Sequence, residues 1–457
     1  MEETMTDLKT DILVVGGGPG GFIVSVTAAT YWPEKKITVV RPEEKSLIPC
    51  GIPYIFGTLG GIEEDLFYGS KEFRATGATL LIDRVESVDG RQRLALLKSG
   101  KRIRWDRLVI STGAEPIMPP LPGANLEGVF TIHKEYDYMD HFFRKHIPNI
   151  QRMVVIGGGF IGVEFAEEIR KHGTEVHLVE MLPHLLLAAF DEDVCIRVEN
   201  ELKHAGVQIH TGTKLESILP DASGKRVAGV RIETGEEITA DAVLVAIGVR
   251  PRNDLAKNMG LSLGRHGAIL VDSFQRTLDD PAIFAVGDCT EKQDFFTRRQ
   301  GGALLASQAA SEGRIAGMNL YGLRLPRFNA GNVAVYISEV GNLGFGAAGL
   351  TYFQAEEQGF LLLVGEASVA DRYPASMPGT REIYCRLIFS KESLQLLGGQ
   401  VLGGRTSGEL VNAIAIAIQT RATATEIVTF QLGAHPRLTG AEHPLIAATE
   451  DALLQRI

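Results

Sequence analysis

A glycine-rich turn that follows an apolar run constrains the fold of this chain more than any other feature. Residues 11–15 predict a buried strand, and they lead directly into Gly16, Gly18 and Gly21, which match G-x-G-x-x-G. A small-residue helix and a second strand at 37–40 are expected to follow. This is the pattern of a βαβ unit, in which the glycines give a tight turn and let a pyrophosphate approach the helix N-terminus.

The same pattern occurs a second time. A strand at 153–156 leads into a second glycine turn, which is followed by a helix at 163–172 and a strand at 175–180. The glycines of this second turn are Gly157, Gly159 and Gly162. Self-similarity over more than a hundred residues indicates a duplicated module, and two bound dinucleotides are the natural inference.

Each copy continues in the same way after its βαβ unit. An alternating, turn-rich stretch at 84–105 and another at 215–238 predict a β-meander in each copy. Each meander is followed by an apolar strand that ends in a glycine. These strand ends contain Thr112 and Gly113 in the first copy and Gly248 in the second. The backbone at these positions is expected to border the bound dinucleotides.

Proline-bearing stretches at 115–123 and 248–252 predict the crossings between the two modules. A strand at 283–286 and a helix from about 302 to 321 are expected after the return. From about 325 the pattern changes to alternating strands (332–339, 360–366, 382–390 and 394–399) and a helix at 408–421. We therefore expect an α/β fold with two Rossmann-like domains, each with a β-meander, and a C-terminal α+β domain.

Composition excludes several classes of protein. The 457 residues allow two to four domains, and 45% hydrophobic with 22% charged residues is typical of a globular protein. The formal net charge of −10 argues against a nucleic-acid-binding protein. Because the N-terminus is acidic and no apolar run approaches the length of a membrane span, we expect a cytoplasmic location without a membrane partner.

The four cysteines are widely scattered and include no C-x-x-C pair. This spacing argues against a disulfide framework and against any metal site. Cys50 stands in a proline- and glycine-rich loop at 46–54, and we expect it to be reactive. We expect Cys195, Cys289 and Cys385 to be buried as small hydrophobic side chains.

The two glycine units, the Ser-Thr-Gly at 111–113, the Phe-Ala-Val-Gly-Asp at 284–288 and the α+β tail together resemble the pyridine nucleotide-disulfide oxidoreductases over essentially the whole chain. The resemblance implies that residues 1–118 and 249–324 form an FAD-binding domain and residues 119–248 an NAD(H)-binding domain. It further implies that residues 325–457 form a dimerisation domain, which completes the partner's active site in a homodimer. Gly287 and Asp288 would then border FAD, with Asp288 hydrogen-bonded to its ribityl chain.

The cysteine pattern separates the subclasses of this family. Dithiol members carry C-x-x-x-x-C, but here Lys45 and Ile55 stand five residues before and after Cys50. The loop instead resembles the single-cysteine branch, which includes coenzyme A disulfide reductases, NADH-dependent persulfide reductases, NADH oxidases and NADH peroxidases. A lone thiolate works through a mixed disulfide, a persulfide or a sulfenic acid. A helix start after Pro49 is expected to stabilise this thiolate.

Glu180 ends the second strand of the second unit, where a carboxylate can accept hydrogen bonds from both ribose hydroxyls and would repel a 2′-phosphate. NADH is therefore favoured over NADPH. The first unit departs from the family pattern, because Arg41 stands where an acidic residue usually binds the FAD ribose. Either Glu43 takes over this contact or Arg41 contacts the adenosine from another direction.

The tail also departs from the pattern. Dithiol members end in His-Pro-Thr-x-x-Glu, whereas this chain keeps the His-Pro at 435–436 and has Gly440 in place of the orienting glutamate. His435 is a candidate proton donor to a leaving thiolate, and a structural role is an equal alternative. A Phe/Tyr-Ser-Ser stretch of coenzyme A disulfide reductases is missing. Tyr373 resembles an interface tyrosine of those enzymes.

These observations predict an FAD-containing, NADH-dependent oxidoreductase that reduces a small disulfide, persulfide or polysulfide at Cys50. Coenzyme A derivatives are the first substrate class, and coenzyme A itself is a candidate bound ligand. One alternative is an NADH oxidase or peroxidase in which Cys50 cycles through sulfenic acid. Another, of a different class, is an NADH-accepting electron-transfer subunit for a partner protein.

Overall fold

The computed structural model describes residues 7–67, 73, 75–324, 326 and 328–456, and this part of the chain divides into two compact units. The first unit holds Met1–Ile117, Thr131–Asn149 and Gly248–Asn332. The second holds Met118–Phe130, Ile150–Ile247 and Val333–Ile457. The chain thus passes between the two units several times and ends in the second. The three-domain division expected from the sequence stays a prediction. Among the described residues, no helix combines the length and apolar character needed to cross a membrane.

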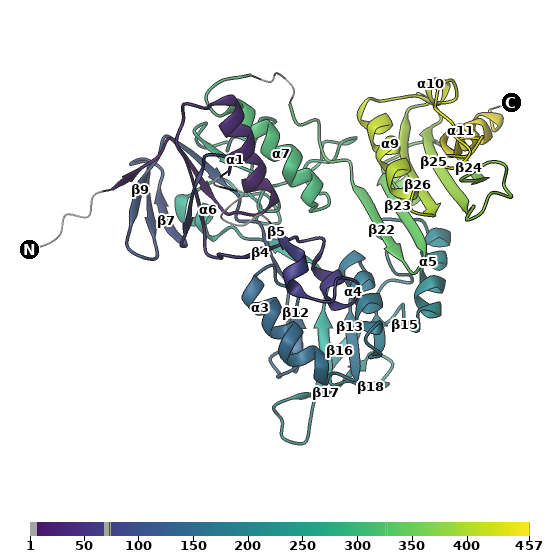
Figure 1. Cartoon of the computed structure of the whole chain (residues 1–457), viewed down its shortest axis with the longest axis horizontal. Coiled ribbons are helices and arrows are strands. Elements are labelled where there is room, and N and C mark those ends of the chain that lie inside the picture. The colour runs from purple at the N-terminus through teal and green to yellow at the C-terminus, as the bar shows by residue number, and fades with distance from the viewer. Residues whose placement is uncertain (1–6, 68–72, 74, 325, 327, 457) are drawn as a thin grey trace, which may run out of the picture. The chain divides into compact units, whose positions relative to one another are not determined.

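The first unit is built on a five-stranded sheet whose hydrogen-bonded neighbours are all parallel, in the order β21-β10-β2-β3-β6. Its strands are β2 (Ile12–Val15), β3 (Ile37–Arg41), β6 (Thr79–Ile82), β10 (Arg107–Ile110) and β21 (Ile283–Ala285). Its longer helices are α1 (Pro19–Tyr31) and α7 (Ala306–Asn319), which pack against each other (Figure 1). The parallel order confirms the predicted Rossmann-like fold of this unit.

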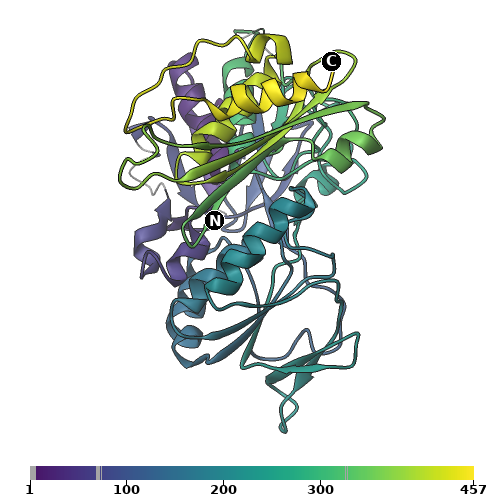
Figure 2. The ribbon, with the colours of Figure 1, turned by 90° about the vertical axis from the view of Figure 1, so that its right-hand side faces the viewer.

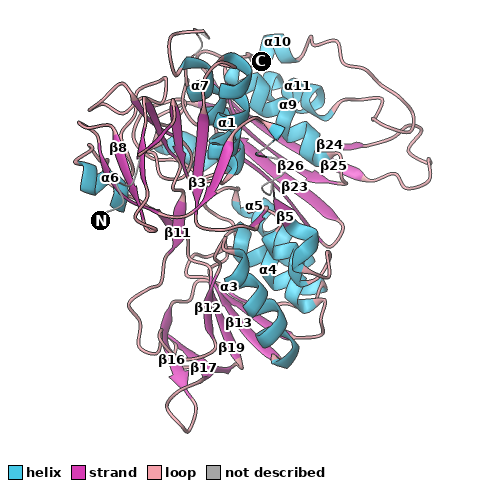
Figure 3. Cartoon of the chain, turned by 60° about the vertical axis from the view of Figure 1, so that its left-hand side comes forward, coloured by secondary structure: helices cyan, strands magenta, loops and turns pink. Residues whose placement is uncertain are grey.

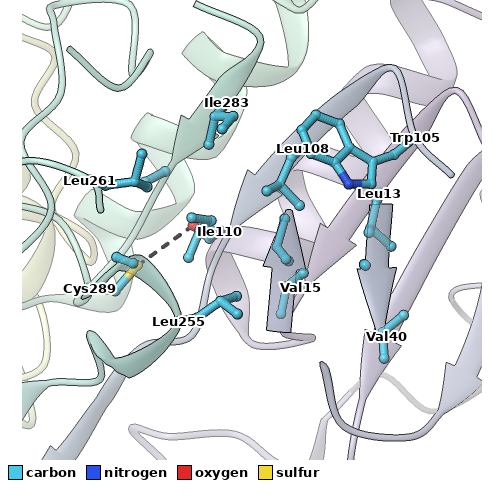
Figure 4. Close-up of a cluster of buried hydrophobic side chains, with 14 of the residues drawn as sticks. Leu13, Val15, Val40, Trp105, Leu108, Ile110, Leu255, Leu261, Ile283 and Cys289 are labelled. Atoms are coloured by element: carbon cyan, nitrogen blue, oxygen red, sulfur yellow. Dashed lines mark hydrogen bonds between the residues drawn. The ribbon is translucent and has the colours of Figure 1, made fainter. Parts of the chain in front are cut away.

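The alternation of side chains along β2 explains how this sheet is buried on both faces. Ile12 and Val14 join a buried cluster with α1 and α7. Leu13 and Val15 point to the other face and join a cluster with the meander, with Trp105 and with Cys289 (Figure 4). Because successive strand residues face opposite sides, a strand that is apolar at every position fits a sheet covered twice.

Smaller elements complete the first unit. The meander forms a sheet in the order β1-β9-β8-β7, and the two proline-bearing crossings pair with each other as the antiparallel strands β11 and β20. These strands are β1 (Leu8–Lys9), β7 (Val85–Asp89), β8 (Leu94–Leu97), β9 (Arg102–Arg104), β11 (Ala114–Pro116) and β20 (Val249–Pro251). The other elements are β4 (Ser46–Leu47), β5 (Leu66–Phe67), α3 (Tyr136–His141), α6 (Asp254–Met259), the 3₁₀ helices η1 (Ile52–Phe56), η2 (Ile62–Asp65) and η4 (Ile147–Asn149), and the π-helix η3 (Phe142–His146).

The second unit repeats the design with a sheet in the order β12-β19-β13-β14-β15 and a meander β16-β17-β18. Its strands are β12 (Val129–Thr131), β13 (Arg152–Ile156), β14 (Glu175–Val179), β15 (Gln208–His210), β16 (Leu215–Pro220), β17 (Val227–Ile232), β18 (Glu237–Thr239) and β19 (Ala242–Val245). Its helices in this region are α4 (Phe160–Arg170) and α5 (Glu192–His204). The predicted duplication is therefore present in the fold.

The C-terminal part of the second unit is an antiparallel sheet in the order β22-β23-β26-β25-β24. Helix α9 packs on β22, β23 and β26, and α11 packs on β24 and β25 (Figures 2 and 3). The elements are β22 (Val335–Val340), β23 (Leu343–Gly349), α8 (Tyr352–Glu357), β24 (Leu362–Ala370), β25 (Glu382–Ser390), β26 (Leu396–Gly403), α9 (Ser407–Gln419), α10 (Ala424–Ile427) and α11 (Pro444–Leu454).

Two local expectations from the sequence differ from the structure. The helix expected from about residue 302 begins at Ala306, because Gly301 and Gly302 have φ values of 129° and 144° that no helix contains. The sequence analysis also missed β23, whose glycines and alanines lack the usual strand signal. Its small residues allow a close approach, since a Cβ at Gly346 would lie 2.4 Å from the Tyr336 carbonyl oxygen.

Candidate active site

The first glycine turn leaves no room for side chains at its first and third glycines, but its middle glycine faces open space. A Cβ at Gly16 would lie 2.1 Å from the Ser111 carbonyl oxygen, and one at Gly21 would lie 2.2 Å from the Gly16 carbonyl oxygen. Gly18 is the N-cap of α1 and has nothing within 4 Å of the corresponding position. The turn therefore leaves open space in front of a helix N-terminus, as a dinucleotide pyrophosphate requires.

The second glycine turn reproduces this geometry. A Cβ at Gly157 would lie 2.5 Å from the Ala246 carbonyl oxygen, and one at Gly162 would lie 1.9 Å from the Gly157 carbonyl oxygen. Gly159 is the N-cap of α4 and again faces open space. The residues present thus fit a second dinucleotide, and the two turns are equivalent in backbone and in available space.

In each unit, the residue at the end of the second strand packs against the glycine turn. The two units differ in the charge of this residue. In the second unit the Glu180 carboxylate accepts hydrogen bonds from the Gly158 N–H at 2.6 Å and the Leu182 N–H at 2.8 Å. A carboxylate offers about four acceptor positions, so two stay available to ribose hydroxyls. The predicted role of Glu180 is compatible with this geometry.

In the first unit the corresponding residue is Arg41, the last residue of β3. Its side chain is 1% exposed, and its Cδ would lie 2.5 Å from a Cβ at Gly17. Its Nη2 donates to the Glu44 carbonyl oxygen at 2.7 Å, and its guanidinium lies 5.3 Å from the Phe73 ring centroid. Burial lowers the pKa of Arg41, an effect that Glu43 opposes.

Glu43, the other candidate for the FAD ribose, is half-buried. Burial raises the pKa of its carboxyl, and the nearby Glu135 acts in the same direction. The assignment of Glu43 to the ribose stays a prediction.

The predicted residues at the strand ends of the first unit lie at one edge of its sheet, because β2, β10 and β21 are parallel. The Thr112 hydroxyl donates to the Arg252 carbonyl oxygen at 2.7 Å, and the Arg252 N–H donates to the Gly113 carbonyl oxygen at 2.9 Å. Gly113 has a φ of 71°. In the other crossing, Gly248 has a φ of 113°, and its carbonyl oxygen accepts the Ile117 N–H at 3.0 Å.

Asp288 follows β21 at the same edge, and the Lys134 ammonium lies 3.0 Å from its Oδ2. The turn at Gly287 is held by a buried ion pair that the sequence analysis missed. Glu312 accepts the Gly287 N–H at 2.7 Å, while Lys292 Nζ donates to the Gly287 carbonyl oxygen at 2.8 Å and to Glu312 at 2.7 Å.

The side chains of Lys292 and Glu312 are 3% and 2% exposed. Burial raises the pKa of Glu312, an effect that the neighbouring ammonium opposes. Both partners of the pair also hydrogen-bond Gly287, so their charges are satisfied where water cannot reach them. Together they hold both main-chain polar groups of the residue that precedes Asp288.

Cys50 is exposed in a tight turn of the first unit. The Gly51 N–H donates to the Ile48 carbonyl oxygen at 2.8 Å, which places Pro49 and Cys50 at the tip of the turn. The chain continues into η1, a 3₁₀ helix of five residues with Gly51 as its N-cap. The helix start expected after Pro49 is therefore a short 3₁₀ segment, and it has few aligned peptide dipoles to stabilise a thiolate.

The other three cysteines are buried, as the sequence predicts. Burial raises the pKa of Cys195 and of Cys385 to about 12, and it raises the pKa of Cys289 as well. A thiol with a raised pKa supplies little nucleophilic thiolate at neutral pH. Cys50 is thus the cysteine that a dissolved substrate can reach.

The two candidates in the C-terminal sheet region, Tyr373 and His435, lie on neighbouring segments of the second unit. The Tyr373 N–H donates to the Pro436 carbonyl oxygen at 3.2 Å, and the His435 N–H donates to the Thr439 hydroxyl at 2.8 Å. The His435 ring is exposed, and its Nδ1 accepts the Arg437 N–H at 3.3 Å. The predicted role of His435 as a proton donor stays a prediction.

Gly440 stands where an orienting glutamate is expected, and the structure gives a reason for the glycine. A Cβ at this position would lie 2.3 Å from the Ala370 carbonyl oxygen. Downstream, His443 caps α11 by accepting the Leu445 N–H at Nδ1, and burial lowers its pKa. His443 therefore has a structural partner at the start of α11.

Comparisons with known proteins agree with this geometry. Residues 10–313 match the model of the pyridine nucleotide-disulphide oxidoreductases, and residues 339–444 match the model of the dimerisation domain of the same family. The chain belongs to the pyridine nucleotide-disulphide oxidoreductases. The family predicted from the glycine units and the tail is thereby confirmed.

Among its relatives in this family, an NADH oxidase of Methanocaldococcus jannaschii is 30% identical, with 96% of this chain and 98% of the relative covered. An NAD(P)H coenzyme A polysulfide/persulfide reductase of Pyrococcus horikoshii is also 30% identical, with 87% and 88% covered. The solved structure of an NAD-dependent persulfide reductase from A. fulgidus has a TM-score of 0.90 and 28% identity, with 98% of this chain and 83% of that chain covered.

The family assignment also clarifies which residues sequence reasoning missed. Lys134, Lys292 and Glu312 support the strand end at Asp288, but they are far apart in sequence and belong to no motif. Glu135 is a further case, because its carboxylate lies 2.7 Å from Arg252 Nη2 and its main chain bridges to Ser46. His133 and then Arg252 hold the pKa of Glu135 at about 2. No sequence signal marks these residues in this pyridine nucleotide-disulphide oxidoreductase.

Proposed function

We propose that this chain is an FAD-dependent NADH oxidoreductase that reduces a small disulfide, persulfide or polysulfide, with coenzyme A derivatives as the first substrate class. The observation that carries the proposal is the contrast among the cysteines. Cys50 is exposed at the tip of a turn, whereas Cys195, Cys289 and Cys385 are buried. Since Lys45 and Ile55 occupy the positions of a second redox cysteine, the chemistry is that of a single sulfur.

The two glycine turns supply the cofactor sites of the proposed enzyme. FAD is bound by the first unit, through Gly16, Gly18, Gly21, Thr112, Gly113, Gly287 and Asp288. NADH is bound by the second glycine turn, through Gly157, Gly159, Gly162 and Glu180, with Gly248 at the strand end. When bound, FAD carries two electrons from the nicotinamide to sulfur.

Cys50 acts as a thiolate in this proposal. It attacks one sulfur of the substrate, the S–S bond of the substrate breaks, and a thiolate or hydrosulfide leaves while a mixed disulfide or persulfide forms on Cys50. The leaving thiolate requires a proton, and His435 is the proposed donor, with Tyr373 as a proposed contact of the substrate. We propose that the chain forms a homodimer, because it contains a family dimerisation domain at 339–444. The cytoplasmic location stays a prediction.

The first test is a Cys50→Ser variant assayed for NADH consumption with coenzyme A disulfide and with polysulfide. We expect turnover to fall by at least about a hundredfold, because a hydroxyl cannot form the mixed disulfide. Cys195→Ala is the matched control, since this thiol is buried and its loss should leave turnover within about twofold. A Cys50→Ser enzyme with full turnover of both substrates would sink the proposal.

The similarity to NADH oxidases favours a second candidate function, in which Cys50 cycles through sulfenic acid and the oxidant is O₂ or H₂O₂. The same variants assayed with these two oxidants separate the candidates. An electron-transfer subunit would instead turn over slowly with every small oxidant and rapidly with a partner protein. Intact-mass analysis of the isolated protein supplies an independent check, because a coenzyme A adduct, extra sulfur or a sulfenic acid on Cys50 has a distinct mass.

A further inference from the structure

Asp65 lies directly beneath the turn that carries Cys50. Its carbonyl oxygen accepts the Ile48 N–H at 2.9 Å, on one side of the turn. On the other side, a Cβ at Gly51 would lie 1.7 Å from Asp65 Oδ1, so the carboxyl group occupies the space of a missing side chain. One residue therefore contacts the chain immediately before and immediately after the tip at Pro49 and Cys50.

The carboxyl group of Asp65 is in an unusual environment for an acid. The side chain is 1% exposed, and its Oδ2 is buried without a hydrogen-bond partner in the part of the chain that the structure describes. Among the described residues no lysine, arginine or histidine forms an ion pair with it. Burial raises its pKa to about 7, although the Ile48 N–H acts in the opposite direction. Ionisation of a buried, unpaired carboxyl places an uncompensated charge inside the protein.

The titratable groups on the neighbouring elements do not neutralise this charge. Asp65 ends η2, which packs against η1. Besides Cys50, Tyr54 is the titratable group of the turn and η1. On η2 itself, Glu63 and Glu64 are exposed, and Glu63 forms an ion pair with Arg144. Among the described residues, the titratable groups on these elements are therefore acids, and Cys50 is the reactive one among them.

We propose that Asp65 is a positioning residue for Cys50: its carboxyl group supports the Ile48–Gly51 turn, and its ionisation opposes loss of the thiol proton. The inference rests on the proposed function in taking Cys50 as the reacting sulfur. The sign follows from Coulomb's law, because a negative charge beneath the turn disfavours a second negative charge at its tip. Below about pH 7 the carboxyl is mostly neutral, and above it the charge is present.

The coupling predicts a particular pH profile for Cys50. As the pH rises, a growing fraction of Asp65 is ionised, and its negative charge raises the apparent pKa of the Cys50 thiol. The thiolate fraction should therefore grow over a wider pH range than a single ionisation allows. An enzyme with a neutral group at position 65 should reach the same thiolate fraction at a lower pH.

The experiment is the rate of Cys50 alkylation by iodoacetamide as a function of pH, followed by peptide mass on the flavin-loaded protein. Asp65→Asn keeps the shape of the side chain and removes its charge. We expect the midpoint of its profile to lie about 0.5 to 1 pH unit below that of the wild type. Glu64→Gln removes an exposed carboxylate one residue away, and its midpoint should stay within about 0.2 unit.

Profiles of Asp65→Asn and wild type that superimpose would overturn the inference. If Asp65→Asn does not fold, the alkylation profile of the wild type tests the inference by itself. A wild-type profile that a single ionisation describes would also overturn it. The assay needs no turnover, so its outcome is separate from that of the proposed function. A Cys50→Ser enzyme that stays active refutes the proposed function, whereas an inactive one with an unchanged Asp65→Asn profile refutes this inference alone.

Discussion

The two dinucleotide-binding regions share a backbone and differ in the charge placed against it. In both, the first glycine closes on a neighbouring strand end, the third closes on the first, and the middle position opens at a helix N-terminus. Against this common frame the first region places the guanidinium of Arg41 and the second places the carboxylate of Glu180.

This difference shows which part of the motif is general and which is specific. The glycines serve any pyrophosphate, since main-chain N–H groups and open space recognise phosphate without regard to the base. The residue at the end of the second strand is predicted to face the ribose, so its charge would select among ribose substituents. A carboxylate accepts hydrogen bonds from free hydroxyls. A buried arginine can instead donate hydrogen bonds to a phosphate or to main-chain carbonyl groups of the protein near the adenosine.

A second difference lies at the edge of each sheet. In the first region β21 adds a Gly-Asp turn that Lys292 and Glu312 hold from below, and in the second region β12 occupies the corresponding edge. The ion pair therefore fixes the main chain of the Gly-Asp turn. In the proposed reaction FAD stays bound in the first region, whereas the second exchanges its nucleotide in each cycle.

The largest expected effect comes from filling either glycine turn. Gly21→Ala puts a methyl carbon 2.2 Å from the Gly16 carbonyl oxygen, and we expect the purified protein to lose at least about nine-tenths of its flavin. Gly162→Ala makes the same change in the second region, and it should leave flavin bound while NADH no longer bleaches it. Visible absorbance with and without NADH measures both. Loss of flavin from both variants would contradict the separate assignment of the regions.

The next effect concerns the buried ion pair of the first region. Lys292→Met leaves the Glu312 carboxyl buried without its cation, which costs about 3–5 kcal/mol of folding stability. Without its cation, Glu312 has a pKa in the folded protein that lies further above its pKa in the unfolded chain. Between these two pKa values the unfolded chain ionises and the folded protein does not, so the variant should lose more stability at pH 8 than at pH 6. Thermal melts at both pH values measure this.

A double variant separates the stability of this pair from its role in positioning. Lys292→Met with Glu312→Leu removes both charges and should recover most of the melting temperature. Flavin affinity should stay reduced, since the Gly287 N–H has then lost its acceptor. Full recovery of both properties would show that the pair does not support the turn.

The smallest of these effects tests the nucleotide preference. Glu180→Gln removes the charge that favours ribose hydroxyls and disfavours a 2′-phosphate. We expect kcat/KM for NADH to fall about tenfold, corresponding to about 1.4 kcal/mol, and the ratio of NADH to NADPH activity to fall with it. Arg41→Gln is the matched change in the first region and should leave this ratio unchanged. An unaltered ratio in Glu180→Gln would remove the assigned role.

Much of this fold could be predicted from the sequence because its signals are local. Gly16 and Gly157, each at the end of an apolar strand, predicted both βαβ units, and the pattern of strands after residue 325 predicted most of the last sheet. The family and the fold class were confirmed. The site residues stay predictions, although the structure brings the segments of Tyr373 and His435 together.

Other features could not be predicted, because they depend on contacts between distant parts of the chain. Lys292 lies in a loop and Glu312 in α7, and no sequence periodicity connects either of them to Gly287. Asp65 belongs to no sequence motif, and only the fold buries it against Gly51. The absence of a glutamate at Gly440 had no explanation in sequence, whereas the Ala370 carbonyl oxygen supplies one.

The sequence by itself determined the duplication, the turn types, the family and the solitary position of Cys50, since each depends on residues close together along the chain. Only the tertiary structure decided which charged side chains pack against those turns, such as Lys292 and Glu312 at Gly287 and Asp65 at Gly51. Burial makes this difference physically important, because a carboxyl or ammonium group away from water changes its pKa and its neighbours according to what packs around it. Segments that are far apart in the sequence form that environment, and no local sequence pattern predicts that they come together.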